Sequence, residues 1–162
     1  MMSPGWQSSS RQIASSVENR MAFAFPFLRI ERLAELLNAQ RKQLGCRIYQ
    51  LEFTDTEKTK PFAFSGIDAL HKAGFQQPPA SEYRLVRDEA IFCPKDEPDL
   101  AVLERVFDHY NGKLPADYPG RCVAPSDVLE LYDAEKRRYY YRDMKQFVPV
   151  AFSPLLARPI QK

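Results

Sequence analysis

The sequence predicts an α+β fold, a mainly antiparallel sheet that contains a C-terminal β-hairpin and is covered by two or three helices. Val128 to Tyr132 and Tyr139 to Tyr141 are aliphatic and aromatic runs separated by a short polar stretch, which is the pattern of a hairpin. Helical and extended patterns also follow one another without the regular β-α-β order of a parallel sheet. The 162 residues are enough to bury a core without crosslinks.

The N-terminal part combines a polar tail, an extended arm and an amphipathic helix. In the arm, Met21-Ala-Phe-Ala-Phe-Pro-Phe-Leu28, the phenylalanines alternate, which places their rings on one side. From Ile30 to Leu44 the leucines recur at helical spacing, and Gly45 follows as a helix stop. The predicted division of the chain is 1–45 for this appendage, 46–152 for the α+β domain and 153–162 for a C-terminal tail.

The first half of the domain predicts two strands and a short helix. Cys46 to Phe53 has the alternation of a half-buried strand, with Tyr49 and Leu51 on one face. Gly66 to Ala73 reads as a helix that ends at Gly74, and Tyr83 to Asp88 as a second strand.

The second half predicts a helix, the hairpin and a last strand. Pro98 begins the helix, and Asn111-Gly112 ends it. Its expected apolar stripe is Leu100, Leu103, Val106, Phe107 and Tyr110. After the hairpin, 147–152 reads as a final strand.

Composition favours a cytoplasmic protein without a metal, a disulfide or a membrane span. The net charge is +2, and residues 1–45 carry six Lys or Arg against three Glu, which is less basic than the surfaces of nucleic-acid binders. The three cysteines form no C-x-x-C pair and are typical of reduced thiols. The longest apolar run, residues 21–28, is too short to cross a bilayer.

Several short motifs occur in an order that resembles the YodL-like domain, a module of proteins from conjugative and other mobile elements. The resemblance covers about residues 46–150 and implies an accessory or host-directed role, without an established reaction or cofactor. Pro125 departs from the pattern, because an ordinary strand residue is expected there. The motifs are Tyr49-Gln-Leu51, Phe62-Ala-Phe64, Tyr83-Arg-Leu-Val86, Val106-Phe-Asp-His-Tyr-Asn111, Pro115-Ala-Asp-Tyr-Pro-Gly120, Val123-Ala-Pro-Ser-Asp-Val-Leu129 and Tyr139-Tyr-Tyr-Arg-Asp143.

No catalytic signature is present in the sequence. His109 and Asp108 are adjacent on the expected helix, so their side chains diverge and do not form an oriented acid–base pair. Ser126-Asp127 is better explained as a turn in which a side-chain oxygen accepts a backbone N–H group. We therefore expect a protein that is not an enzyme and that needs no cofactor.

The second hairpin strand supplies the candidate binding surface. Arg138, Tyr140 and Arg142 share one face of a strand, and Tyr139 and Tyr141 share the other. If the latter face is core, a tyrosine between two arginines is exposed, a combination typical of protein interfaces and also of single-stranded nucleic-acid binding. The candidate binding residues are Arg137, Arg138, Tyr140, Arg142 and Lys145.

These observations predict a protein-interaction module, encoded on a mobile element, that engages a host or element-encoded protein as an inhibitor or modulator. A nucleic-acid-binding accessory is the alternative, and a nuclease using His109 is the weaker third reading. A solvated face without a partner is the competing interpretation of the arginines and tyrosines.

Overall fold

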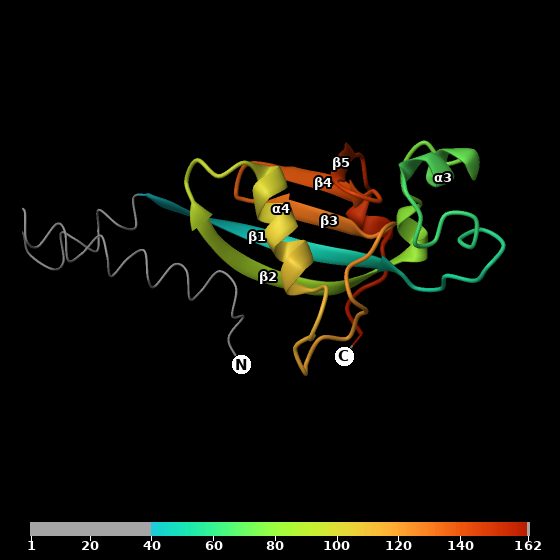
Figure 1. The fold of residues 1–162 in the computed structure, drawn as a ribbon, viewed down its shortest axis with the longest axis horizontal. Coiled ribbons are helices and arrows are strands. Elements are labelled where there is room, and N and C mark those ends of the chain that lie inside the picture. The colour runs from blue at the N-terminus through green and yellow to red at the C-terminus, as the bar shows by residue number, and fades with distance from the viewer. Residues whose placement is uncertain (1–39, 162) are drawn as a thin grey trace, which may run out of the picture.

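The computed structural model describes residues 40–161 as an α+β fold built on one antiparallel five-stranded sheet (Figure 1). The strand order is β2-β1-β3-β4-β5. The described elements are β1 (Arg41–Leu51), α3 (Ile67–Lys72), η1 (Ala80–Glu82), β2 (Tyr83–Pro94), α4 (Asp99–His109), β3 (Val128–Tyr132), β4 (Arg137–Arg142), β5 (Phe147–Val150) and η2 (Pro154–Leu156).

The predicted hairpin lies at the middle of this sheet. β3 and β4 pair in antiparallel register, with Leu129 opposite Tyr140, and the polar residues 133–136 join them. The other side of β3 pairs with β1, so β3 is the central strand. β5 then adds an edge strand, and its Pro149, which has no N–H group, is tolerated at such a position. The hairpin is therefore interior to the sheet and does not end it.

One face of the sheet is covered by α4, which crosses the strands in the front of Figure 1. Pro98 occupies the N-cap position and Asp99 the first turn, where an acidic side chain favours the helix dipole. The buried side chains of α4 are Val102, Leu103 and Val106. Leu100 was expected in this stripe but is exposed, because Val102 occupies the inward position instead.

A second core lies on the opposite face, at the end of the sheet where α3 packs. Successive side chains of a strand point to opposite faces, and those of Tyr49 and Leu51 in β1 point to this one. There they pack with Leu70 of α3 and with Phe152, which follows β5. The chain leaves α3 through Gly74, whose φ of +94° favours glycine. β1 is therefore buried on both faces at its centre, and the half-buried strand expected there is wrong.

The predicted helix over 30–44 is wrong in its last turn. Arg41 to Leu44 belong to β1, which is eleven residues long, and Gly45 lies inside the strand instead of ending a helix. Leu44 is buried under α4 together with Cys46 and Ile48. Residues 41–44 form a strand despite their helical spacing, because β2 pairs with β1 along its whole length and this tertiary pairing outweighs local propensity. The remainder of this prediction, with the tail and the arm, lies outside the described residues.

The C-terminal residues are not a free tail. After η2, Arg158 forms a bridge with the outer side of β2: the Leu85 N–H donates to the Arg158 carbonyl at 2.9 Å, and the Arg158 N–H donates to the Tyr83 carbonyl at 2.8 Å. β2 itself is longer than predicted and continues to Pro94. These additions enlarge the sheet at its β2 edge.

Candidate functional site

The arginine–tyrosine face predicted to be exposed lies under α4. Tyr140 and Arg142 are only 9% and 6% exposed. The Tyr140 hydroxyl donates to Asp99 of α4 at 2.5 Å, and the Arg138 guanidinium pairs with the same carboxylate. Burial alone would raise the pKa of Asp99, but the hydrogen bonds from Arg138 and Tyr140 hold it below its usual value. The prediction of exposure is wrong because the hairpin is buried on both faces.

Arg142 is an internal anchor for the helix. Its guanidinium carbon lies 3.9 Å from the centre of the Phe107 ring and 5.0 Å from that of Phe147, and its Nη1 donates to Glu104 at 2.9 Å. A cation between aromatic faces and a carboxylate stabilises a packed helix. Arg138, Tyr140 and Arg142 therefore hold α4 on the sheet.

The other two candidate residues lie elsewhere. Arg137 is exposed and belongs to the opposite face of β4, and Lys145 is exposed in the turn between β4 and β5. The structure therefore does not bring the five predicted residues together into one surface. Arg137 is the one that leads to a different site.

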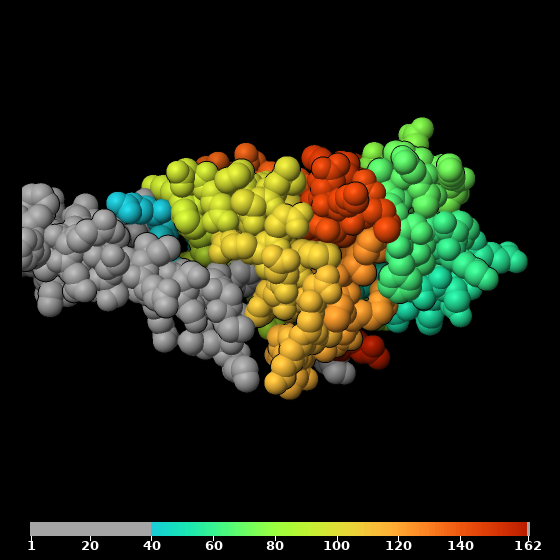
Figure 2. Space-filling view, in the orientation of Figure 1, coloured from blue at the N-terminus to red at the C-terminus, as the bar shows by residue number. Residues whose placement is uncertain are grey.

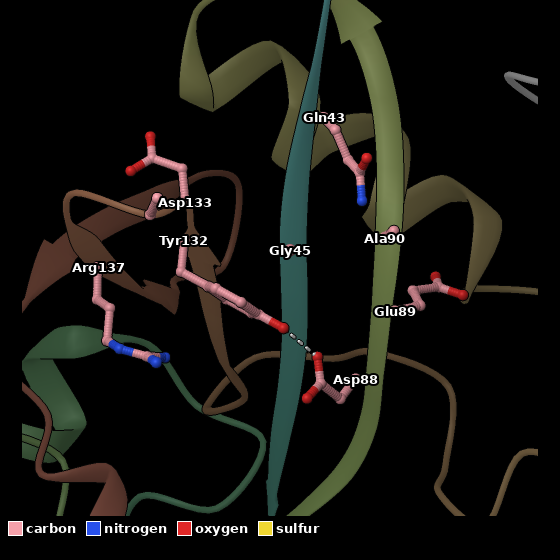
Figure 3. Close-up of a pocket in the computed structure, with 9 residues that line it drawn as sticks. Gln43, Gly45, Asp88, Glu89, Ala90, Tyr132, Asp133 and Arg137 are labelled. Carbon is pink, nitrogen blue, oxygen red and sulfur yellow. Dashed lines mark hydrogen bonds between the residues drawn. The ribbon is translucent and has the colours of Figure 1, made fainter.

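That site is built around Tyr132, whose ring lies flat across β1 and reaches β2 (Figure 3). The Tyr132 hydroxyl donates to Asp88 Oδ1 at 2.6 Å. The path is open only because residue 45 is glycine: a Cβ atom there would lie 2.1 Å from the Tyr132 ring. Gly45 is thus the position that lets an aromatic side chain cross the central strand.

A buried carboxylate organises the arginines beside this ring. Glu130, which is 0% exposed, accepts hydrogen bonds from Tyr49 at 2.9 Å and from Arg137 at 2.6 Å. Arg47 lies 3.8 Å from the same carboxylate and donates to Asp88 at 2.9 Å. Arg47 and Arg137 also stack over the Tyr132 ring, at 4.8 and 4.9 Å from its centre. Two cations and an aromatic ring are consequently held in one fixed arrangement.

These side chains form the wall of a shallow groove, which we call the Tyr132 groove. It follows the half of the sheet face that α3 does not reach, and Phe92 of β2, 50% exposed, stands next to Ala90 on the same face. Asp88 and Asp133 make the groove partly acidic, whereas Arg137 is the only basic residue among the described ones that line it. The residues that define it are Gln43, Asp88, Ala90, Tyr132, Asp133 and Arg137.

The family motifs converge on a different place, the turn at Ser126-Asp127. Asp127 Oδ2 accepts hydrogen bonds from Gln50 Nε2 at 3.0 Å and from the Ala124 N–H at 2.9 Å. Asp127 is fully buried, and its Oδ1 atom has no hydrogen-bond partner within residues 40–161. Burial raises the pKa of Asp127 to about 7. The predicted turn role of this pair is therefore confirmed.

Ser126 links this turn to two other motifs. Its carbonyl accepts the Tyr83 hydroxyl at 2.6 Å, and its Oγ accepts the Phe64 N–H at 3.1 Å. Ser126 and Phe64 both have positive φ, of 80° and 58°, which is uncommon outside glycine. Figure 2 shows the green lobe that carries Phe64 against the orange segment that leads to Ser126. The motif residues therefore specify how these loops join.

The residues considered for chemistry, His109 and Asp108, lie at the end of α4. Burial lowers the pKa of His109, whose ring packs edge-on against Tyr110, while Asp108 is exposed. Residues 40–161 contain no group of three or more His, Cys, Asp or Glu side chains placed to share a metal ion. Over the same residues, no helix has the length and apolar character needed to cross a membrane.

Sequence reasoning missed the Tyr132 groove because it assigned Gly45 to a helix end. One signal was present: Glu130 interrupts an otherwise apolar and aromatic strand, Val128 to Tyr132. A charge at the centre of such a strand requires buried partners. Those partners, Arg47 and Tyr49, lie about 80 residues earlier, and only the β1–β3 register brings them near.

Comparison with known proteins gives one match. The model of the YodL-like domain matches residues 45–152, which is more than half of the chain. No curated protein and no solved structure matches it. The matched region begins within β1 and ends just after β5, so it contains the groove residues from Gly45 onward and the motifs that meet at Ser126-Asp127, whereas Gln43 lies just before it. The chain belongs to the YodL-like domain family.

Proposed function

We propose that this protein is a non-enzymatic interaction module of a mobile genetic element, and that it binds a host or element-encoded protein in the cytoplasm through the Tyr132 groove. Binding inhibits or modulates the partner. The observation that carries the proposal is the fixed cluster of Tyr132, Arg47 and Arg137 on a sheet half that no described helix covers. The mobile-element context comes from the resemblance of the motifs to the YodL-like domain.

The cluster has the properties of a protein-binding hot spot. Tyrosine and arginine are enriched where partners bind most tightly, and rigid side chains lose little conformational entropy on binding. The Tyr132 hydroxyl is already bound to Asp88, and both guanidinium groups are already stacked on the ring. The exposed Phe92 supplies an apolar contact beside them. A partner therefore meets a surface that is already ordered.

Nucleic acid is the alternative partner, because two arginines and a tyrosine suit phosphate and base contacts. The charges of the groove favour protein. Arg137 is paired with Glu130 and Arg47 with Asp88, so both cations are neutralised by a neighbouring carboxylate. Asp133 adds another negative charge at the rim. A phosphate backbone would be repelled by these acids.

Affinity purification from host lysate with the full chain as bait tests the proposal. We expect at least one protein to be retained by the wild type and lost with Tyr132→Ala, because that change removes the aromatic centre of the groove. Lys145→Ala is the matched control, since Lys145 is exposed in the β4–β5 turn outside the groove. Equal retention of every partner by Tyr132→Ala and by the wild type would place binding elsewhere.

A titration with single-stranded and duplex DNA at low salt separates the two classes of partner. We expect no submicromolar binding, because the groove arginines are already paired. Tight binding that weakens steeply with added salt, and that Arg137→Ala reduces, would replace the protein-interaction function by the nucleic-acid one.

A further inference from the structure

β2 is an edge strand with a long unpaired side. One side pairs with β1 along the whole strand. On the other side, Arg158 pairs only with the beginning of the strand, through Tyr83 and Leu85. From Val86 to Pro94, no described residue pairs with the outer side of β2. A free edge of this length is a template for another strand.

The register of β1 against β2 shows which backbone groups of β2 face outward. The Lys95 N–H donates to the Gln40 carbonyl, so the pair just beyond the end of β2 is hydrogen-bonded. In antiparallel strands hydrogen-bonded and non-hydrogen-bonded pairs alternate, which makes the pair of Ala90 with Gly45 non-hydrogen-bonded. The N–H and C=O groups of Asp88, Ala90 and Phe92 therefore point away from β1.

This edge is only partly protected against pairing. Natural edges are blunted by charged side chains, especially lysine, and by proline, bulges or short length. β2 has twelve residues; the charges of its free part are confined to Arg87, Asp88 and Glu89, its register shift lies at Val86 where the free part begins, and its only proline is the final Pro94. Ala90 is exposed, and Phe92 is 50% exposed. The strand therefore presents both unpaired backbone and an apolar side chain.

We propose that a second copy of this chain pairs with β2. The two β2 strands run antiparallel about a twofold axis at Ala90 and join the two sheets into one. Ala90 then pairs with Ala90 of the second copy, and Asp88 pairs with Phe92 of the second copy. The Ala90 pair and the two pairs of Asp88 with Phe92 each exchange two N–H···O bonds, and the contact is the same for both copies.

The axis position follows from the free segment itself. Val86 to Pro94 is centred on Ala90, whose small side chain allows close approach at the axis. An axis at Asp88 would set two carboxylates opposite each other. An axis at Phe92 would pair Ala90 with Pro94, which has no N–H group to donate. The Ala90 axis avoids both problems at the centre of the edge, and Pro94 then faces Val86 only at the two ends of the free segment.

The dimer also completes the Tyr132 groove. Asp88 lines the groove, and in this register Phe92 of the second copy lies directly across from it. Both side chains point to the face opposite α4, because cross-strand neighbours share a face. Each copy thus adds an aromatic side chain to the open end of the other copy's groove.

Sedimentation velocity of the full chain, from low to several hundred micromolar, tests the proposal. We expect the wild type to dimerise within this range. Ala90→Lys and Ala90→Glu should each weaken the dimer about fivefold or more, since like charges meet at the axis. An equimolar mixture of the two variants should restore it, because opposite charges then meet. Met144→Lys is the control, as Met144 is exposed in the turn between β4 and β5, away from the β2 edge and from the groove, and it should dimerise like the wild type.

Two results would overturn the inference. A wild type that remains monomeric throughout the range would show that a second copy does not pair with the β2 edge. A dimer that neither charge variant weakens, or that the mixture fails to restore, would show that Ala90 does not lie at the axis. Thermal unfolding of each variant confirms that it is folded before it is scored.

Discussion

Substituting Gly45 by alanine tests whether the flat placement of Tyr132 depends on a missing side chain. The Cβ atom at residue 45 would meet three atoms of the Tyr132 ring at 2.1–2.5 Å, well inside contact distance. Tyr132 belongs to β3, and its hydroxyl donates a hydrogen bond to Asp88 on β2. The ring can therefore move away from β1 only if this hydrogen bond breaks. We therefore expect Gly45→Ala to destabilise the fold although it replaces glycine inside a strand.

The expected loss follows from the contacts that the ring makes. A hydrogen bond to a charged acceptor contributes about 1.5–3 kcal/mol, with the lower end appropriate for the exposed Asp88. The stacking of Arg47 and Arg137 on the ring adds roughly 0.5–1 kcal/mol for each cation. Replacing glycine in a strand returns about 0.5–1 kcal/mol. The net change in the free energy of unfolding is a loss of about 2 kcal/mol.

Urea unfolding of a double-mutant cycle measures this coupling. In a Tyr132→Ala background the ring is gone, so Gly45→Ala should be neutral or slightly stabilising. Gly112→Ala is the matched control, because a Cβ atom at Gly112 meets nothing within 4 Å. An equal cost of Gly45→Ala in both backgrounds would refute the reasoning.

Two further predictions concern buried charge. The pKa of Asp127 in the folded chain, about 7, lies above the 3.8 of a free aspartate, so the folded state holds the proton more tightly. The free energy of unfolding should therefore fall as the pH rises from about 4 to about 7. At about 1.4 kcal/mol per pKa unit, the fall is on the order of 4 kcal/mol. Denaturant titrations at several pH values measure it, and the fall should disappear in Asp127→Asn. Arg142→Met should lower the free energy of unfolding by about 1–3 kcal/mol, because it removes the stacking and the ion pair that hold α4. The control Lys145→Met should change it by less than about 0.5 kcal/mol. Similar effects of the two substitutions would show that Arg142 is not an anchor.

The elements that could be predicted are those with strong local patterns. The hairpin strands Val128–Tyr132 and Arg137–Arg142 have apolar or aromatic runs on both sides of a polar turn, and α4 has an N-cap proline and a helical apolar stripe. The turn role of Ser126-Asp127 was also predictable, since side chains of this type bond to the backbone two or three residues away. In each case the deciding interactions lie within a few residues.

The site could not be predicted because it depends on contacts between distant parts of the chain. The sequence of β4 does not show that both of its faces are covered. It also does not show that α4 packs on the face that carries Tyr140. Leucines spaced for a helix do not show that Leu44 belongs to a strand whose partner, Ile91, lies far along the chain. The role of Gly45 then follows only from Tyr132, which reaches it across the sheet.

The position of β1 between β2 and β3 has a consequence for synthesis on the ribosome. Tyr49 of β1 reaches its hydrogen-bond acceptor Glu130, 81 residues later in the chain. At a translation rate of about 5–20 residues per second, β1 waits roughly 4–16 s before the strand that closes its second side has been made. During that interval one edge of an apolar strand is open in the nascent chain, where chaperones bind and where neighbouring chains aggregate. The delay is set by chain order and not by stability, because Glu130 is made 81 residues after Tyr49 whatever the strength of the finished contact.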